Sequence, residues 1–167
     1  MKIILDDSAI KESLYPFGVV NPVSSIRVGI LTLKEKWERI TGAVVFESVD
    51  SFIKSAGDKN EKPDLFIESN IIPTKEWWGE VYPSVSAGNV TLNTEGNNKV
   101  KKLEHPWQIF QLNDWALRQD YDLITANRPS QPISFTNKII APENNFIEAG
   151  AKVEHSIINA STGPEYI

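Results

Sequence analysis

Three short apolar segments, separated by helical patterns, constrain the fold of this chain more than any other feature of its sequence. They are Lys2–Leu5, Ala43–Phe46 and Leu65–Ile67, and runs of this length bounded by turn residues are typical of buried strands. Helical spacing is found over residues 9–14, 26–40 and 49–56. Strands that alternate with helices favour a mostly parallel sheet with helices on both faces. The sequence therefore predicts a three-layer α/β domain.

The loops that follow the first and third segments are the expected place for a binding site. Ligands of α/β proteins bind beyond the carboxyl ends of the strands, which here open onto Asp6–Glu12 and Glu68–Thr74. Asp6 and Asp7 are interpreted first as a turn and a helix cap, and second as metal ligands.

The second predicted helix has signals at both of its ends. Ser24 or Ser25 is the expected cap, and Gly42 is the expected end, because glycine readily adopts the left-handed conformation that terminates helices. Arg27 then stands at the start of this helix.

The pattern weakens after Thr74, where we expect only a strand at Asn89–Leu92. Pro106 then opens a helix, since proline suits a first helical turn and apolar residues follow at helical steps. This helix is predicted to reach about Gln119 and to continue irregularly to Thr125. The α/β domain is accordingly expected to span residues 1–125.

Composition excludes several classes of protein and site. Cysteine is absent, which rules out disulfide frameworks and thiolate metal sites and suits a reducing compartment. His105 and His155 are the only imidazoles, so no structural metal site is expected. A net charge of −5 argues against nucleic-acid binding, which relies on clustered Lys and Arg. Because no stretch approaches the roughly 18–20 apolar residues of a membrane helix, we expect a cytoplasmic protein without a membrane partner.

The last part of the chain has a different period. Residues 147–152 and 153–158 form two six-residue units, each beginning with a branched aliphatic residue. This is the hexapeptide period of a parallel β-helix. We therefore expect residues 126–141 to be a connector and residues 142–167 to be the first units of a truncated left-handed β-helix.

The same period predicts which side chains are buried in this segment. Ile147 and Val153 should point into the coil, and Ile157 should be buried with them. Lys152 and Glu154 flank these positions and should face solvent.

Longer strings of the sequence resemble a known family: IRVGILTLKEKW at 26–37, PWQIFQLN at 106–113, SQPIS at 130–134 and ASTGP at 160–164. They resemble the sugar nucleotidyltransferases of Bacteroidetes, which are similar to the bifunctional N-acetylglucosamine-1-phosphate uridyltransferase. The resemblance implies a nucleotidyltransferase-like α/β domain ahead of a left-handed β-helix that often carries acyltransferase chemistry. It also implies a longer natural protein that forms a homo-oligomer, a trimer at full length.

Nucleotidyl transfer from a nucleoside triphosphate to a sugar 1-phosphate requires a loop that holds phosphates and carboxylates that hold Mg²⁺. Active relatives place a glycine-rich loop with an arginine after the first strand. Here Asp6–Glu12 contains no glycine, so we expect no backbone nest for phosphate in that loop.

The resemblance also indicates candidate substrate-binding residues. Asn21 stands where relatives have an arginine before proline, and Glu68 and Asn70 lie where they have the metal aspartate. Asn70 is a poor Mg²⁺ ligand by comparison, and Glu68 could substitute for it. Arg27 is equally well explained by a surface salt bridge or by ligand binding. Arg128 is interpreted first as fixing the crossing between domains and second as a ligand-binding residue.

Two functions remain open from the sequence. The first is a sugar-phosphate nucleotidyltransferase that uses Mg²⁺, a nucleoside triphosphate and a sugar 1-phosphate. The second is an inactive nucleotidyltransferase-like domain, which binds a ligand or positions a β-helix acyltransferase.

Overall fold

A computed structural model describes residues 1–48, 63–88, 92 and 94–167 of the chain. The chain forms two compact units, Met1–Leu117 and Arg118–Ile167, which are described separately below. Within the described residues, no helix is long and apolar enough to cross a membrane.

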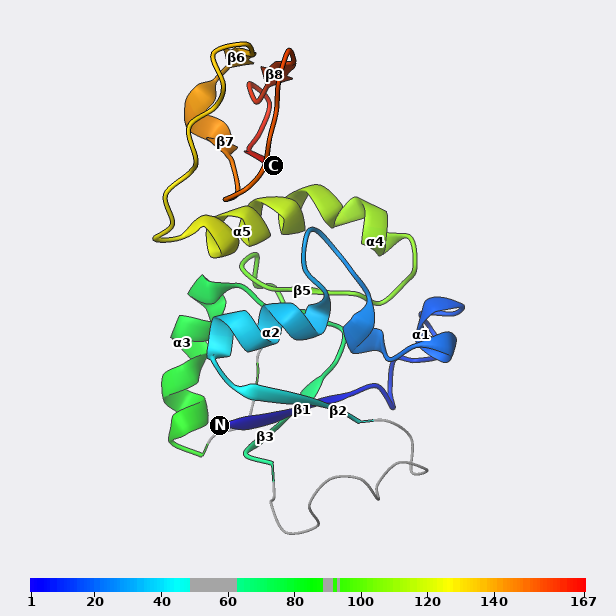
Figure 1. Ribbon diagram of the computed structural model, residues 1–167. Coiled ribbons are helices and arrows are strands. Elements are labelled where there is room, and N and C mark those ends of the chain that lie inside the picture. Colours follow the sequence, from blue (N-terminus) through cyan, green and yellow to red (C-terminus); the bar gives the residue numbers. More distant parts are fainter. Residues whose placement is uncertain (49–62, 89–91, 93) are drawn as a thin grey trace. The chain divides into compact units, whose positions relative to one another are not determined.

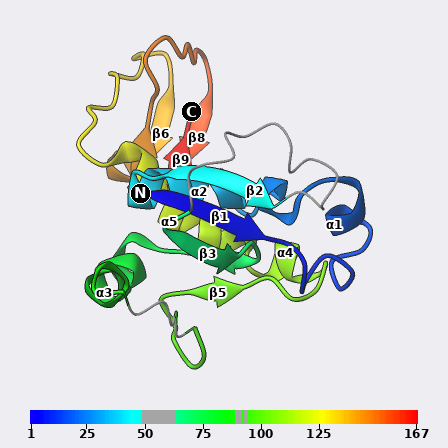
Figure 2. The same ribbon diagram turned by 90° about the horizontal axis from the view of Figure 1, so that it is seen from below.

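The first unit is built on a parallel sheet of three strands, β1 (Lys2–Asp6), β2 (Val44–Ser48) and β3 (Leu65–Glu68). Strand β1 lies in the centre and pairs in parallel with β2 on one side and β3 on the other, as Figure 2 shows. The predicted strands and their parallel pairing are therefore confirmed.

The two faces of this sheet differ in burial. Inward-pointing residues from all three strands, such as Leu5, Val45 and Ile67, are buried, whereas Phe66 on the opposite face is 60% exposed. Helix α2 (Leu33–Thr41) lies over the buried face (Figure 1). The helix predicted over residues 49–56, which was expected to add a helical layer, lies outside the described residues. The three-layer arrangement therefore stays a prediction.

Helix α2 ends as predicted but begins later. Gly42 has φ of 63° and donates its N–H to the Glu38 carbonyl, which closes the helix. The N-terminus is a capping box, in which the Thr32 side chain accepts from the Glu35 N–H and the Glu35 carboxylate accepts from the Thr32 N–H. The expected cap at Ser24 or Ser25 is wrong, because those residues lie in a short 3-10 helix, η1 (Val23–Ser25).

The helix predicted at residues 9–14 is also wrong. Residues 8–16 form successive turns and are followed by a short helix, α1 (Phe17–Val20). Local side-chain bonds compete with a continuous helix, since Ser8 donates to Asp6 and Ser13 donates to the Ile10 carbonyl.

The remaining elements of the first unit follow the sheet. A two-residue strand β4 (Ile71–Ile72) pairs antiparallel with β5 (Lys101–Lys102). Between them lies α3 (Lys75–Ser86), which the sequence analysis missed; Thr74 caps it by accepting from the Trp77 N–H at 3.2 Å. The strand expected at Asn89–Leu92 falls mostly outside the described residues.

The helix predicted from Pro106 is present in two pieces. They are α4 (Gln108–Gln111) and α5 (Asn113–Thr125), which meet at Leu112.

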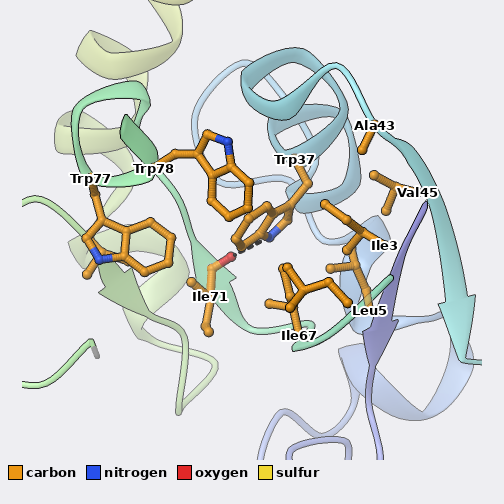
Figure 3. Packing of buried hydrophobic residues seen from close by; sticks show 11 residues of the cluster. Ile3, Leu5, Trp37, Ala43, Val45, Ile67, Ile71, Trp77 and Trp78 are labelled. Atoms are coloured by element: carbon orange, nitrogen blue, oxygen red, sulfur yellow. Dashed lines mark hydrogen bonds between the residues drawn. The ribbon is translucent and has the colours of Figure 1, made fainter. Parts of the chain in front are cut away.

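An indole cluster joins α2, α3 and the sheet in the core of the first unit. Trp37 lies edge-on to Trp77 and Trp78, with ring centroids 6.1 and 5.6 Å apart (Figure 3). The Trp37 Nε1–H donates to the buried Ile71 carbonyl at 3.2 Å. The indole thus supplies both apolar contact and the hydrogen bond that a buried carbonyl requires.

The second unit contains two small parallel pairs of strands. Strand β6 (Lys138–Ile140) pairs with β8 (Ile157–Asn159), and β7 (Asn145–Phe146) pairs with β9 (Glu165–Tyr166). A 3-10 helix, η3 (Pro142–Asn144), separates β6 from β7. Side chains extend the first pair, since Asn137 Oδ1 accepts from the Ser156 N–H, 19 residues along the chain.

The predicted burial in this unit is partly wrong. Ile147 is buried, Val153 is half-buried, and Lys152 and Glu154 are exposed, as expected. Ile157, however, is 75% exposed, and its neighbour Ile158 is buried in its place. Neighbouring strand residues point to opposite faces. The inward-facing residue is therefore Ile158, one position after the residue that was predicted.

The Trp37 hydrogen bond can be tested by substitution. Trp37→Phe leaves the buried Ile71 carbonyl without its donor, and we expect it to lower the free energy of unfolding by about 1–3 kcal/mol. The control is Trp107→Phe, at an indole that is 57% exposed, which should change it by less than about 0.5 kcal/mol. Urea denaturation of both variants measures the difference, and equal losses would contradict a role for the bond.

Candidate functional site

The carboxyl ends of the three parallel strands form the candidate site. We call the carboxyl edge the group of residues Asp7, Glu47, Glu68, Ser69 and Asn70, which lie at or just beyond these ends. Asp6 of β1 pairs with Glu68 of β3, and the Ser69 N–H donates to the Asp6 carbonyl at 3.0 Å. The two predicted binding loops therefore start side by side.

Asp6 and Asp7 have different surroundings although they are neighbours. The Asp6 carboxylate accepts from the Ser8 N–H at 3.1 Å and from the Ser8 hydroxyl at 2.9 Å, which makes it a turn residue as interpreted. Asp7 is buried, and its Oδ2 accepts from the Val23 N–H at 2.9 Å. Its Oδ1 is buried and has no hydrogen-bond partner among the described residues.

Strand β2 adds a carboxylate that the sequence analysis missed. Glu47 Oε1 accepts from the Ser24 hydroxyl at 2.9 Å and lies 3.7 Å from Lys34 Nζ on α2. The signal was its place at the end of the second apolar segment, because parallel strands end at the same side of a sheet.

Glu68 and Asn70 lie close in sequence but have different roles. Glu68 forms an ion pair with Lys102 of β5 at 2.6 Å, and about half of its side chain is exposed. Asn70 is buried and donates from Nδ2 to the Leu103 carbonyl at 3.2 Å. Asn70 Oδ1 and the neighbouring Ser69 Oγ are both buried, and neither has a hydrogen-bond partner in the part of the chain that the structure describes.

Arg27 does not stand at the start of a helix, which corrects the prediction. It forms a single β-bridge with Thr32 and donates to the Ile30 carbonyl, and its guanidinium lies 3.8 Å from Glu35. The pKa of Glu35 is lowered chiefly by the Thr32 N–H. The guanidinium of Arg27 contributes less to this shift. Arg27 therefore stabilises the approach to α2, in line with the salt-bridge interpretation.

Asn21 is exposed at the end of α1, where its N–H donates to the Phe17 carbonyl. It lies two residues before Val23, whose N–H binds Asp7. The structure shows no side-chain bond that would orient Asn21 among the described residues.

Arg128 belongs to the second unit and is held there by several groups. It donates to Glu148 and to the Tyr166 hydroxyl, and its guanidinium lies 5.3 Å from the centre of the Phe146 ring. Tyr166 stacks on Phe146 at 5.4 Å. These contacts fasten the chain after α5 to β7 and β9 within the second unit.

The polar groups at the carboxyl edge are oxygen atoms and ammonium groups. The described residues contain no group of three or more His, Cys, Asp and Glu placed to hold a metal. The carboxyl edge instead combines carboxylates with hydroxyl and amide oxygens, and Lys34 and Lys102 lie against its acids. Such a set can meet both a hard cation and a phosphate.

A family model described as sugar nucleotidyl transferase matches residues 2–87, just over half of the chain. The chain belongs to the sugar nucleotidyl transferase family. The matched residues include all three strands of the sheet and the whole carboxyl edge. No curated protein and no solved structure matches the chain. The match therefore covers the segment that builds the candidate site, and this segment is a nucleotidyltransferase-like domain.

Arg128, Glu148 and Tyr166 form a network of hydrogen bonds in the second unit. Because of this network, we expect the stability of the second unit to depend on pH. The Tyr166 hydroxyl and then Arg128 lower the pKa of Glu148 from its ordinary value of 4.5. A lowered pKa means that the ionised carboxylate stabilises the fold above pH 4.5, and that this stability is lost as pH falls through the lowered value. Glu148→Gln should therefore reduce stability at neutral pH and flatten its loss on acidification.

Thermal melting at a series of pH values measures this effect. Glu143→Gln, at an exposed glutamate of the same unit, is the matched control and should keep the wild-type profile. A wild-type profile in Glu148→Gln would show that the network does not stabilise the unit.

Proposed function

We propose that the first unit transfers a nucleotidyl group from a nucleoside triphosphate to a sugar 1-phosphate at the carboxyl edge, with Mg²⁺ as cofactor. The observation that carries this proposal is the family match, because it covers the three parallel strands and the residues at which they end. In this reaction the sugar phosphate oxygen attacks the α-phosphorus, and pyrophosphate leaves. A specific relationship to the sugar nucleotidyltransferases of Bacteroidetes, and through them to the bifunctional N-acetylglucosamine-1-phosphate uridyltransferase, is part of the same proposal.

The charges at the carboxyl edge suit this reaction. Lys102 lies 2.6 Å from Glu68 and can exchange that contact for a phosphate, since both positions are partly exposed. Lys34 is held 3.7 Å from Glu47 on the adjoining strand. Transfer of this kind depends mainly on positioning and on charge stabilisation, which ammonium groups and a bound cation supply.

A second function is supported by candidate binding residues that already form contacts with other groups of the protein. Glu68 is neutralised by Lys102, Arg27 is bound within its own loop, and no glycine precedes Lys11 in the first loop. In this alternative the first unit binds a nucleotide or a sugar phosphate without turnover, or positions a β-helix acyltransferase.

We further propose that the second unit begins a left-handed β-helix, through which the full-length protein forms trimers. The support is the parallel pairing of β6 with β8 and of β7 with β9, because successive coils of a β-helix pair in parallel. The cytoplasmic location also stays a prediction, which rests on composition.

Pyrophosphate release tests the transferase function. The chain is incubated with UTP or dTTP, a sugar 1-phosphate and Mg²⁺, and we expect release that EDTA abolishes. Lys102→Met should lower kcat/KM by about 10-fold or more, the effect of losing a charged hydrogen bond. Lys75→Met, at an exposed lysine at the start of α3, is the matched control and should change little.

Calorimetric titration with the same ligands separates the two functions. Binding without pyrophosphate release would favour the non-catalytic function. Absence of both binding and release would contradict the transferase function and the ligand-binding function, and only the positioning of a β-helix acyltransferase would remain.

A further inference from the structure

We propose that two copies of this chain associate through their second units, with the Phe135 ring of each copy inserted into a groove on the other. This groove, which we call the apolar groove, has a volume of about 410 Å³, and Phe135 lies beside it. Its apolar walls come from Pro132, Ile133, Ile147 and Val153. The proposal concerns a surface of the second unit and is independent of the reaction proposed for the first.

The first argument is the exposure of Phe135. The residue is 98% exposed, more than any other large apolar residue that the structure describes. It stands in a turn, where Gly, Pro, Asn, Asp and Ser are the usual residues, so local conformation does not explain a phenylalanine there. An aromatic ring buries about 150–250 Å² when it is covered. A partner that covers the ring therefore gives this residue a role.

The second argument is the rigidity of the turn that carries the ring. The Asn137 N–H donates to the Ser134 carbonyl at 3.1 Å, which closes the turn around Phe135. The two neighbours of Phe135, Ser134 and Thr136, both donate from their hydroxyls to one carboxylate oxygen of Glu154. The backbone on both sides of the ring is thus fixed before association, and binding orders little more than the ring itself.

The third argument is that the ring and the apolar groove belong to the same unit of one chain. Phe135 does not fill the groove of its own copy, since the residue is 98% exposed. A groove of about 410 Å³ has room for a phenyl ring, because pockets from about 300 Å³ accept much larger ligands. Two copies related by a two-fold axis can therefore exchange their rings. Such a contact is closed at the dimer.

The fourth argument is charge. Lys152 and Glu154 are both exposed, carry opposite charges and line the apolar groove. A two-fold axis that passes between them sets Lys152 of each copy against Glu154 of the other. Opposite charges across an interface favour the matching partner and fix its register. This self-complementary pair favours a second copy of the chain over an unrelated partner.

Sedimentation velocity over a range of protein concentrations tests the association. We expect the wild type to reach twice the mass of the chain. Phe135→Ser introduces a usual turn residue and should raise the dissociation constant by more than about 10-fold, the effect of losing a central aromatic contact. Phe110→Ser, at a phenylalanine of α4 that is 79% exposed, is the matched control and should retain the dimer.

A mixing experiment tests whether the apolar groove receives the ring. Ala151→Trp fills the groove and should also weaken the dimer, with an unchanged circular dichroism spectrum. Phe135→Ser keeps its groove and Ala151→Trp keeps its ring. The two variants together should therefore associate more strongly than either variant alone, which a purely structural role of Phe135 would not produce.

A charge variant keeps the proposal testable if Ala151→Trp does not fold. Lys152→Glu sets acids against each other across the two-fold axis and should weaken the dimer. Lys138→Glu, at an exposed lysine of β6 in the same unit, is its control and should not.

The outcomes separate a second copy from other occupants. A monomeric wild type, or a dimer that Phe135→Ser leaves unchanged, would overturn the proposal. A trimer would favour the β-helix assembly proposed above and would also overturn it. Mixed variants that do not associate would assign the groove to another occupant, such as a small apolar ligand, and reject the exchange.

Discussion

The parallel hydrogen bonding of β1 on both of its edges is the constraint on which the first unit depends. It places the ends of three strands at one side of the sheet, although the strands lie far apart in sequence. Asp7 follows the central strand, with the strand that carries Glu47 on one side and the strand that leads to Ser69 on the other. The inward face of the same strands forms the apolar core, so the pairing that buries Leu5 and Ile67 also sets the direction of the residues that follow.

A second apolar cluster supports the residues around the carboxyl edge. It joins the segment from Leu14 to Leu33 with Ile72, Leu103 and Ala116. Hydrogen bonds strengthen this contact. The Leu103 N–H donates to the Asn70 carbonyl, Asn70 Nδ2 donates to the Leu103 carbonyl, and the Gly29 N–H donates to Asn113 Oδ1 at 2.9 Å. The loops at the carboxyl edge are therefore held in place by the apolar cluster that packs against them.

The sequence was sufficient for features that depend on local pattern. Apolar runs revealed the three strands, and Gly42 revealed the end of α2. The start of α2 was misplaced because Ile26 and Val28 are apolar through core packing of a non-helical segment, and not through helical periodicity. Helix α3 was missed because Gly79 and Pro83 argue against a helix, while tertiary contacts of its indoles stabilise it. The position of Ile157 failed because a one-residue shift reverses the buried face.

The candidate site shows the same division between pattern and geometry. Asp6 and Asp7 are the same residue type at adjacent positions, and no sequence rule assigns different roles to them. Strand alternation turns Asp6 toward Ser8 and turns Asp7 inward beside Val23. Only the second arrangement leaves a buried oxygen without a partner among the described residues. Two acids in a loop without glycine are unsuited to bind phosphate through backbone amides.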